Sequence, residues 1–144
     1  MNYINRVQFN KALDLYNSSK FELSKEICIL ILKKNRDELN VNFLLSKIEK
    51  SNKNYAGAIN HLNIALKVEP ENIEILIELG DVYKTIKNYP KALENYDKVI
   101  NLSPNSCMEY AKCAEIMMLM KQYQIGIDLY SKAYHLDNNN FEII

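Results

Sequence analysis

The sequence repeats itself every 34 residues, and this period limits what the chain can fold into. Seven columns of residues spaced 34 positions apart agree in size and polarity along the 144-residue chain. Two columns hold only small residues: Ala12, Ser46, Gly80 and Ala114 in one, and Ser24, Ala58, Ala92 and Gly126 in the other. A fixed period of roughly 20–50 residues is typical of repeat proteins, in which each unit is one supersecondary element.

Each 34-residue unit has the pattern of two helices. In the third unit, apolar residues recur at helical spacing from Ile73 to Ile86. Pro90 then suits the first turn of a second helix, and the pair Ser103-Pro104 ends that helix. Gly and Pro number only 3 each, too few for a β protein with many turns. We therefore predict an all-α fold of antiparallel helix pairs, with the small columns where paired helices approach closely.

At these residues the chain resembles the tetratricopeptide repeat family. The fullest match is LGDVYKTIKNYPKALENYDKVINLSP, residues 79–104. Lys11 departs from the family pattern of a large apolar residue, and Arg36 and Asn138 stand where the family usually has proline. The resemblance implies a right-handed superhelical solenoid, with the first helix of each pair lining a concave groove. We expect one domain over residues 1–144, with repeats at about 5–38, 39–72, 73–106 and 107–140.

The end of the fourth repeat has no polar cap. Residues 141–144 (Phe-Glu-Ile-Ile) are in phase with the start of a further helix, whereas helical arrays need a polar terminal face. We therefore expect a fragment of a longer protein whose last helix exposes Ile127, Tyr130 and Tyr134. The alternative, which stays open, is a small protein that forms a homodimer through this uncapped C-terminal end.

Equivalent positions of successive first helices give the side chains of the expected groove. We predict that these residues bind a partner: Phe9, Leu13, Tyr16, Phe43, Lys47, Lys50, Glu74, Ile77, Asp81, Lys84, Met108, Glu115 and Met118. A buried aromatic anchor can contribute about 2 kcal/mol or more, whereas an exposed ion pair contributes about 0–1 kcal/mol. We thus expect apolar residues at both ends to dominate affinity and the charged centre to tune specificity. The alternative is that Phe9 and Phe43 pack within the array and the acidic residues form a solvated face.

No motif in the sequence indicates catalysis. HExxH, CxxC, GxGxxG, GxxxxGK[ST] and GxSxG are all absent, so we expect neither an enzyme nor a cofactor or metal site. His61 and His135 are expected to be exposed. The three cysteines lack CxxC spacing, which indicates free thiols in a reducing compartment, cytoplasmic or nuclear. Two of them, Cys28 and Cys113, fall on core columns.

Charge and hydropathy exclude two further classes of partner. The 18 basic and 18 acidic residues give a net charge of zero, which argues against binding to nucleic acid or to a membrane surface. The longest apolar run, residues 27–32, is far shorter than the roughly 20 residues of a membrane span. The family's carboxylate clamp for chaperone tails, counted from the first repeat, would fall on Phe9, Leu13, Leu44, Glu74 and Glu78, none of which is basic. Counted from the second repeat, it would fall on Phe43, Lys47, Glu78, Met108 and Lys112, of which only two are basic, so we expect no such clamp.

These observations lead to a non-catalytic protein–protein interaction scaffold. We expect it to bind a peptide or helix of another protein in its concave groove, because a rigid groove leaves most of the ordering cost to the ligand. The alternative is a targeting or self-assembly module of a larger enzyme or multi-subunit complex.

Overall fold

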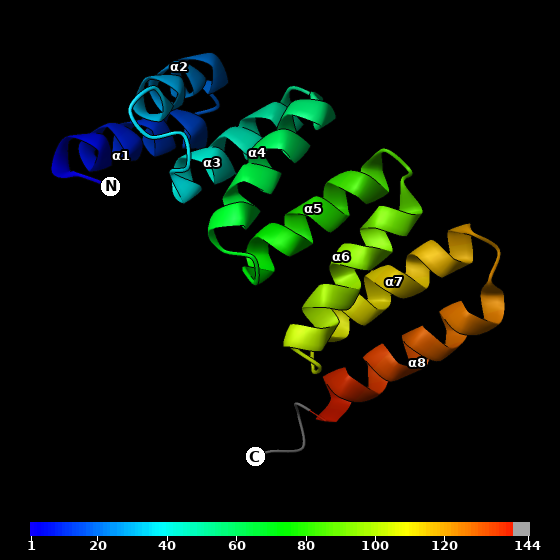
Figure 1. Ribbon diagram of the computed structural model, residues 1–144. Coiled ribbons are helices and arrows are strands. Elements are labelled where there is room, and N and C mark those ends of the chain that lie inside the picture. The colour runs from blue at the N-terminus through cyan, green and yellow to red at the C-terminus, as the bar shows by residue number, and fades with distance from the viewer. Residues whose placement is uncertain (140–144) are drawn as a thin grey trace. The chain divides into compact units, whose positions relative to one another are not determined.

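The computed structural model describes residues 1–139, which form eight helices and no strand (Figure 1). The helices are α1 (Tyr3–Asn17), α2 (Phe21–Leu32), α3 (Leu39–Ser51), α4 (Tyr55–Val68), α5 (Ile73–Thr85), α6 (Tyr89–Leu102), α7 (Cys107–Leu119) and α8 (Tyr123–Asn139). Each predicted repeat contains one pair of helices, so the prediction of an all-α class is confirmed. The predicted further helix at residues 141–144 lies outside the described residues.

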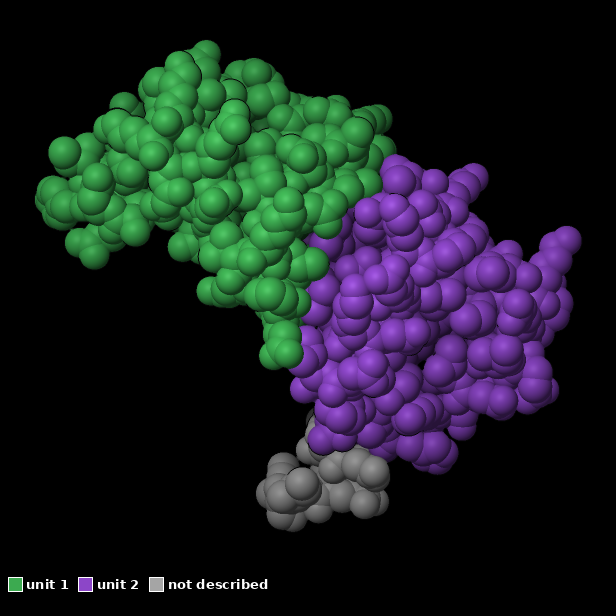
Figure 2. Space-filling view, viewed as in Figure 1, with its two compact units in different colours: residues 1–75 green, residues 76–144 purple. Residues whose placement is uncertain are grey.

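The chain divides into two compact units, residues 1–75 and 76–144 (Figure 2). The division falls inside α5, so it does not coincide with a boundary between repeats. Unit 1 contains α1 to α4, and its buried core comes from three helices: Ala12 of α1, Cys28 and Ile31 of α2, and Val41, Leu44, Leu45 and Ile48 of α3. Unit 2 contains α6 to α8 and most of α5, and includes the buried residues Leu79, Val82, Tyr96, Val99, Cys113 and Ile116.

The two columns of small residues are buried, as close packing of paired helices requires. Ser24 on α2 donates a hydrogen bond from Oγ to the carbonyl of Ala12 on α1 at 2.7 Å. In unit 2, a Cβ atom on Gly80 would overlap the ring of Tyr96. Small residues therefore let the second helix of a pair, or its aromatic side chain, reach the backbone of the first helix.

The turn between the helices of each pair also recurs with the 34-residue period. Its last residue but one has a positive φ, near 60°, in all four pairs: Ser19, Lys53, Lys87 and Lys121. The next amide N–H donates back into the first helix, as from Asn54 to the Glu49 carbonyl at 2.8 Å and from Asn88 to the Tyr83 carbonyl at 2.8 Å. A left-handed residue closing a helix is usually glycine, so serine and lysine at these positions do not predict this turn.

The boundaries of the third repeat follow its proline residues. Pro90 lies in the first turn of α6, and α6 ends at Leu102, directly before Ser103-Pro104. Both predicted boundaries are confirmed. The first residues of a helix have no intrahelical partner for their N–H groups, so proline costs nothing there.

The last helix exposes an aromatic side chain at a position that the earlier repeats bury. Cys28, Leu62 and Tyr96 occupy one column and are at most 1% exposed, whereas Tyr130 in the same column is 44% exposed. Ile127 and Tyr134 are 55% and 66% exposed. The expectation for these three residues of α8 is confirmed.

Candidate functional site

The first helices of unit 1 form a cavity of about 410 Å³, which we call the α1–α3 pocket. It is lined by residues of α1 and α3: Phe9, Leu13, Tyr16, Asn17, Asn40, Phe43, Leu44 and Lys47. Five of the predicted groove residues thus lie together, namely Phe9, Leu13, Tyr16, Phe43 and Lys47. Lys50 and Glu74, also predicted, lie in unit 1 outside this lining.

The apolar side chains of the α1–α3 pocket are partly buried. Phe9, Leu13 and Tyr16 pack against the core of unit 1 and also line the cavity. The Tyr16 ring lies 5.4 Å from the ring of Phe21, measured between centroids. Packing within the array and a groove surface are therefore not alternatives for these residues, since each side chain contributes to both. The contacts with the core hold the pocket in one shape.

Lys47 is the one cationic residue in the lining of the α1–α3 pocket. Lys47 Nζ lies 4.5 Å from the centroid of the Phe43 ring and 3.8 Å from Glu74 Oε1. Ammonium groups are attracted to the face of an aromatic ring, by about 0.5–1 kcal/mol at exposed sites. The Glu74 side chain is 70% exposed, so its ion pair with Lys47 is weakly held.

In unit 2 the equivalent position of Lys47 is Asp81, which belongs to a hydrogen-bonded network. Asp81 accepts a hydrogen bond from Tyr96 Oη at 2.5 Å and two from Lys112 Nζ at 3.0 and 3.2 Å. The Asp81 side chain is 34% exposed. Burial, and then the neighbouring Asp81 carboxylate, raise the pKa of Tyr96, so the hydroxyl stays protonated and donates. Asp81 joins α5 to α6 and α7 and is not simply part of a solvated face.

The remaining predicted groove residues of unit 2 are more open to solvent. Lys84 Nζ and Glu115 Oε2 form an ion pair at 2.8 Å between α5 and α7. Ile77 is half-buried, whereas Met108 and Met118 are 65% and 36% exposed. Methionine side chains adapt their shape easily, so these two could pack against varied apolar surfaces.

Sequence reasoning missed a polar contact on the other side of unit 1. His61 was expected to be exposed, but it is half-buried, with Nδ1 2.9 Å from Oδ1 of the fully buried Asn42. Burial lowers the pKa of His61, so its ring is neutral at pH 7. The expectation was wrong because His61 contacts Asn42, which lies in the first turn of the neighbouring helix α3. The repeat pattern does not indicate this contact. His135 is exposed, as expected.

The cysteines behave as structural residues. Burial raises the pKa of the Cys28 thiol to about 11 and that of the Cys113 thiol to about 12, so both stay protonated and unreactive at neutral pH. All three cysteines, including the half-buried Cys107, are free thiols. Over residues 1–139 no group of three or more His, Cys, Asp or Glu side chains could hold a metal ion. Over the same range, no helix is long and apolar enough to cross a membrane.

Stacked helix pairs, buried small columns and a recurring left-handed turn define a helical-repeat protein. Residues 73–106 match the family model of the tetratricopeptide repeat. That segment is the third helix pair, so the resemblance of the chain to the tetratricopeptide repeat family is confirmed.

Solved structures with the same fold cover nearly the whole chain. A crystal structure of MamA has a TM-score of 0.89 at 14% identity, covering 96% of this chain and 81% of that one. MamA from residue 41 to its end, from Desulfovibrio magneticus RS-1, has a TM-score of 0.85 at 14% identity, covering 94% of this chain and 76% of that one. These likenesses confirm the predicted solenoid of helix pairs. A search of curated proteins finds no match.

Proposed function

We propose that the protein is a non-catalytic interaction scaffold that binds a peptide or helix of another protein through the α1–α3 pocket. The observation that carries the proposal is a preformed cavity of about 410 Å³ with Phe9, Tyr16 and Phe43 on its walls. Tetratricopeptide repeats generally bind proteins, which supports the proposal. Free thiols throughout support a cytoplasmic or nuclear location.

The pocket has the physical properties of a good anchor site. Aromatic side chains are enriched among the residues that dominate binding energy, because they give large contact areas with few rotatable bonds. Contacts with the core already hold the rings of Phe9 and Tyr16, so little of their conformational entropy is lost on binding. The pocket therefore suits one large apolar side chain of the partner. Lys47 and Asn40, which also line the pocket, can form hydrogen bonds with polar groups next to that side chain.

Unit 2 contributes less affinity in this proposal than the sequence suggests. The Asp81 carboxylate already accepts hydrogen bonds from Tyr96 and Lys112, so a partner would have to displace them. Lys84 and Glu115 likewise neutralise each other. We infer that these residues set specificity and that the apolar walls of unit 1 dominate affinity.

A second candidate function, self-assembly, rests on α8. Tyr130 is 44% exposed in a column that is otherwise buried, and Tyr134 and Ile127 continue the same apolar surface. Exposed apolar surface of this kind favours association. Sedimentation equilibrium from about 1 to 100 µM, a range that brackets micromolar affinities, distinguishes the two: a dimer that Tyr134→Asp abolishes supports self-assembly, and a monomer throughout contradicts it.

The scaffold proposal is tested by removing the aromatic wall. Peptides selected from a displayed random library on the wild-type protein are titrated by fluorescence anisotropy against Phe43→Ala. We expect about 30-fold weaker binding, corresponding to about 2 kcal/mol for one aromatic anchor. Met118→Ala, in unit 2, is the control and should change affinity less than threefold. A folded Phe43→Ala protein with full affinity would contradict the proposal.

A further inference from the structure

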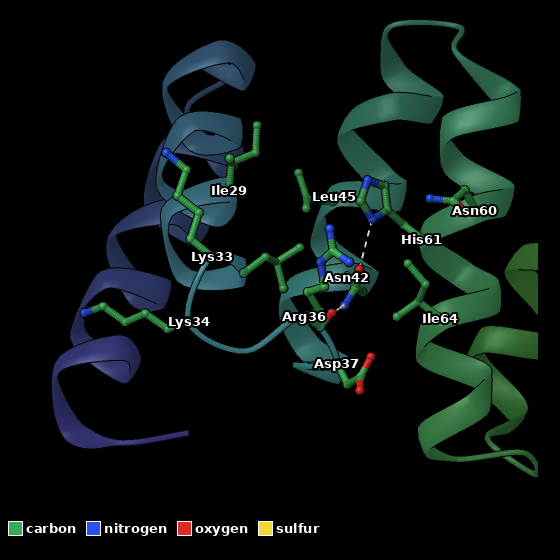
Figure 3. Close-up of a pocket in the computed structure, with 11 residues that line it drawn as sticks. Ile29, Lys33, Lys34, Arg36, Asp37, Asn42, Leu45, Asn60, His61 and Ile64 are labelled. Carbon is green, nitrogen blue, oxygen red and sulfur yellow. Dashed lines mark hydrogen bonds between the residues drawn. The ribbon is translucent and has the colours of Figure 1, made fainter.

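Unit 1 has a second and larger cavity, about 780 Å³, between its two second helices; we call it the α2–α4 pocket (Figure 3). Its apolar floor consists of Ile29, Leu32, Leu45 and Ile64. It shares no lining residue with the α1–α3 pocket, which is formed by the first helices. The function proposed above does not use it.

The α2–α4 pocket lies where the first repeat departs from the other repeats. Helix α2 ends at Leu32, whereas α4 ends at Val68, which is equivalent to Lys34 in the repeat. The connection between α2 and α3 is therefore residues 33–38, six residues, while the connections at 69–72 and 103–106 have four. Arg36 stands where the other two connections have proline. The early end of α2 leaves space beside α4, and the longer connection borders that space.

The lining of the α2–α4 pocket includes three cations and one acid. Figure 3 shows Arg36 between α2 and α4, and the Lys33 and Lys34 side chains extending away from α4. Lys33, Lys34 and Arg36 all come from the α2–α3 connection, and Asp37 is the one acidic residue of the lining (Figure 3). Within the described residues, none of the three cations forms an ion pair, whereas Lys25 of the same unit pairs with Glu49 at 2.8 Å. The lining therefore has a net positive charge, because Asp37 offsets only one of its three cations.

Hydrogen bonds hold the cationic connection in place. The buried Asn42 donates from Nδ2 to the carbonyl of Arg36 at 2.8 Å and to that of Glu38 at 3.1 Å. Because Nδ2 donates, Oδ1 is the acceptor at 2.9 Å from His61 Nδ1, so this nitrogen carries the hydrogen. In the neutral ring Nε2 is then a hydrogen-bond acceptor on the pocket wall. The connection is thus preorganised, which reduces the cost of binding.

We propose that the α2–α4 pocket binds an acidic peptide segment that carries one aliphatic side chain. Lys33, Lys34 and Arg36 contact its carboxylates, and the aliphatic side chain lies on the apolar floor. His61 Nε2 accepts a hydrogen bond from a backbone N–H of the peptide. The cavity volume falls within the range of known ligand sites, about 300–1,000 Å³, and its mixture of apolar floor and few polar groups is typical of them.

Nucleic acid fits this pocket less well than an acidic peptide does. Binding along a phosphate backbone needs an extended basic surface and, for single strands, aromatic rings on which bases stack. Here the cations lie on one short connection, Asp37 lies beside them, and His61 is the only ring in the lining, which contains no Phe, Tyr or Trp. An aliphatic floor instead matches a peptide side chain.

The test uses a fluorescein-labelled peptide, Glu-Asp-Glu-Leu-Glu-Asp, titrated with the full chain by fluorescence anisotropy. The double variant Lys34→Glu, Arg36→Glu should bind at least tenfold more weakly, since both side chains are exposed and their removal leaves the fold intact. The control Lys20→Glu, Lys67→Glu changes the net charge equally at exposed positions of the same unit and should bind within threefold of wild type. Phe43→Ala should also bind like wild type, which separates this site from the α1–α3 pocket.

A second probe tests the apolar floor. Replacing the peptide leucine with serine should weaken binding about fivefold, and Ile29→Ser in the protein should remove that difference. Equal binding of the leucine and serine peptides would overturn the proposal that the apolar floor binds the aliphatic side chain, since charge attraction alone would then explain the binding. Equal losses in the two double variants, wild-type affinity of Lys34→Glu, Arg36→Glu, or no binding of the peptide by wild type would each overturn the proposal. A single-stranded oligonucleotide that binds more tightly than the peptide would overturn it too.

Discussion

The two units carry the same repeat but present different chemistry at equivalent positions of their first helices. In unit 1, Phe43 lines a cavity and Lys47 lies at its edge. One repeat later these positions hold Ile77 and Asp81, and Asp81 hydrogen-bonds with Tyr96 and with Lys112. One unit thus offers an open apolar pocket, and the other uses its polar side chains to join its own helices.

This difference shows which residues determine the backbone and which are free to vary. The small columns are buried in both units, and the left-handed turn has the same φ in both, 60° at Lys53 and 61° at Lys87. Neither feature depends on the groove residues. A repeat protein can therefore change its binding chemistry one unit at a time, since contacts in such folds are made mainly between neighbouring repeats.

The largest expected effect concerns Tyr96, the buried tyrosine of the unit 2 network, and tests how much it contributes to stability. Tyr96→Ala should lower the free energy of unfolding by about 3–5 kcal/mol, because it removes a fully buried aromatic ring and leaves a cavity. Tyr130→Ala is the matched control at the equivalent position of α8, where the ring is 44% exposed, and should cost about 1 kcal/mol or less. Urea unfolding followed by circular dichroism gives both values. Equal losses would mean that the two tyrosines of this column do not differ in burial as described.

A smaller effect is expected at the two charged side chains that occupy equivalent positions, Lys47 in unit 1 and Asp81 in unit 2. Asp81→Ala should cost about 1–3 kcal/mol, since it leaves the Tyr96 hydroxyl without its acceptor. Lys47→Ala in unit 1 should cost about 0–1 kcal/mol, because its ion pair with Glu74 is long and exposed. Both are measured by urea unfolding.

A double-mutant cycle then assigns the cost of Asp81→Ala. Combining it with Tyr96→Phe should cost less than the sum of the single changes, because both remove the same hydrogen bond. Additive losses would show that this hydrogen bond contributes nothing to stability, and unit 2 would then resemble unit 1 in its energetics.

The fold could be predicted from the sequence because it depends on many residues acting in the same way. Small residues recur at Ala12 and Ser24 and their equivalents, and each column repeats the same packing constraint four times. The prolines added two exact boundaries for α6. Five of the eight residues that line the α1–α3 pocket were indicated by the same periodic argument, since equivalent positions on neighbouring first helices lie side by side.

The parts that could not be predicted depend on single side chains. The pairing of Asp81 with Tyr96, and of Asn42 with His61, follows from particular rotamers and occurs in one repeat each. The α2–α4 pocket arises from a helix that ends two residues early, and no proline or glycine marks that end. The left-handed turn was also missed, since serine and lysine occupy it.

The smallest expected effect concerns the left-handed turn that the two units share. Lys53→Gly in unit 1 and Lys87→Gly in unit 2 should each raise the free energy of unfolding by about 0.5 kcal/mol. A left-handed conformation costs a non-glycine residue about 1–2 kcal/mol, and the greater freedom of glycine in the unfolded chain offsets about 0.5–1 kcal/mol of that gain. Lys98→Gly, inside α6, is the control and should lose about 1 kcal/mol. Urea unfolding of all three variants measures these changes. If the free energy of unfolding rises in one unit and falls in the other, the two turns are not equivalent, and the units differ in their backbone as well as in their groove residues.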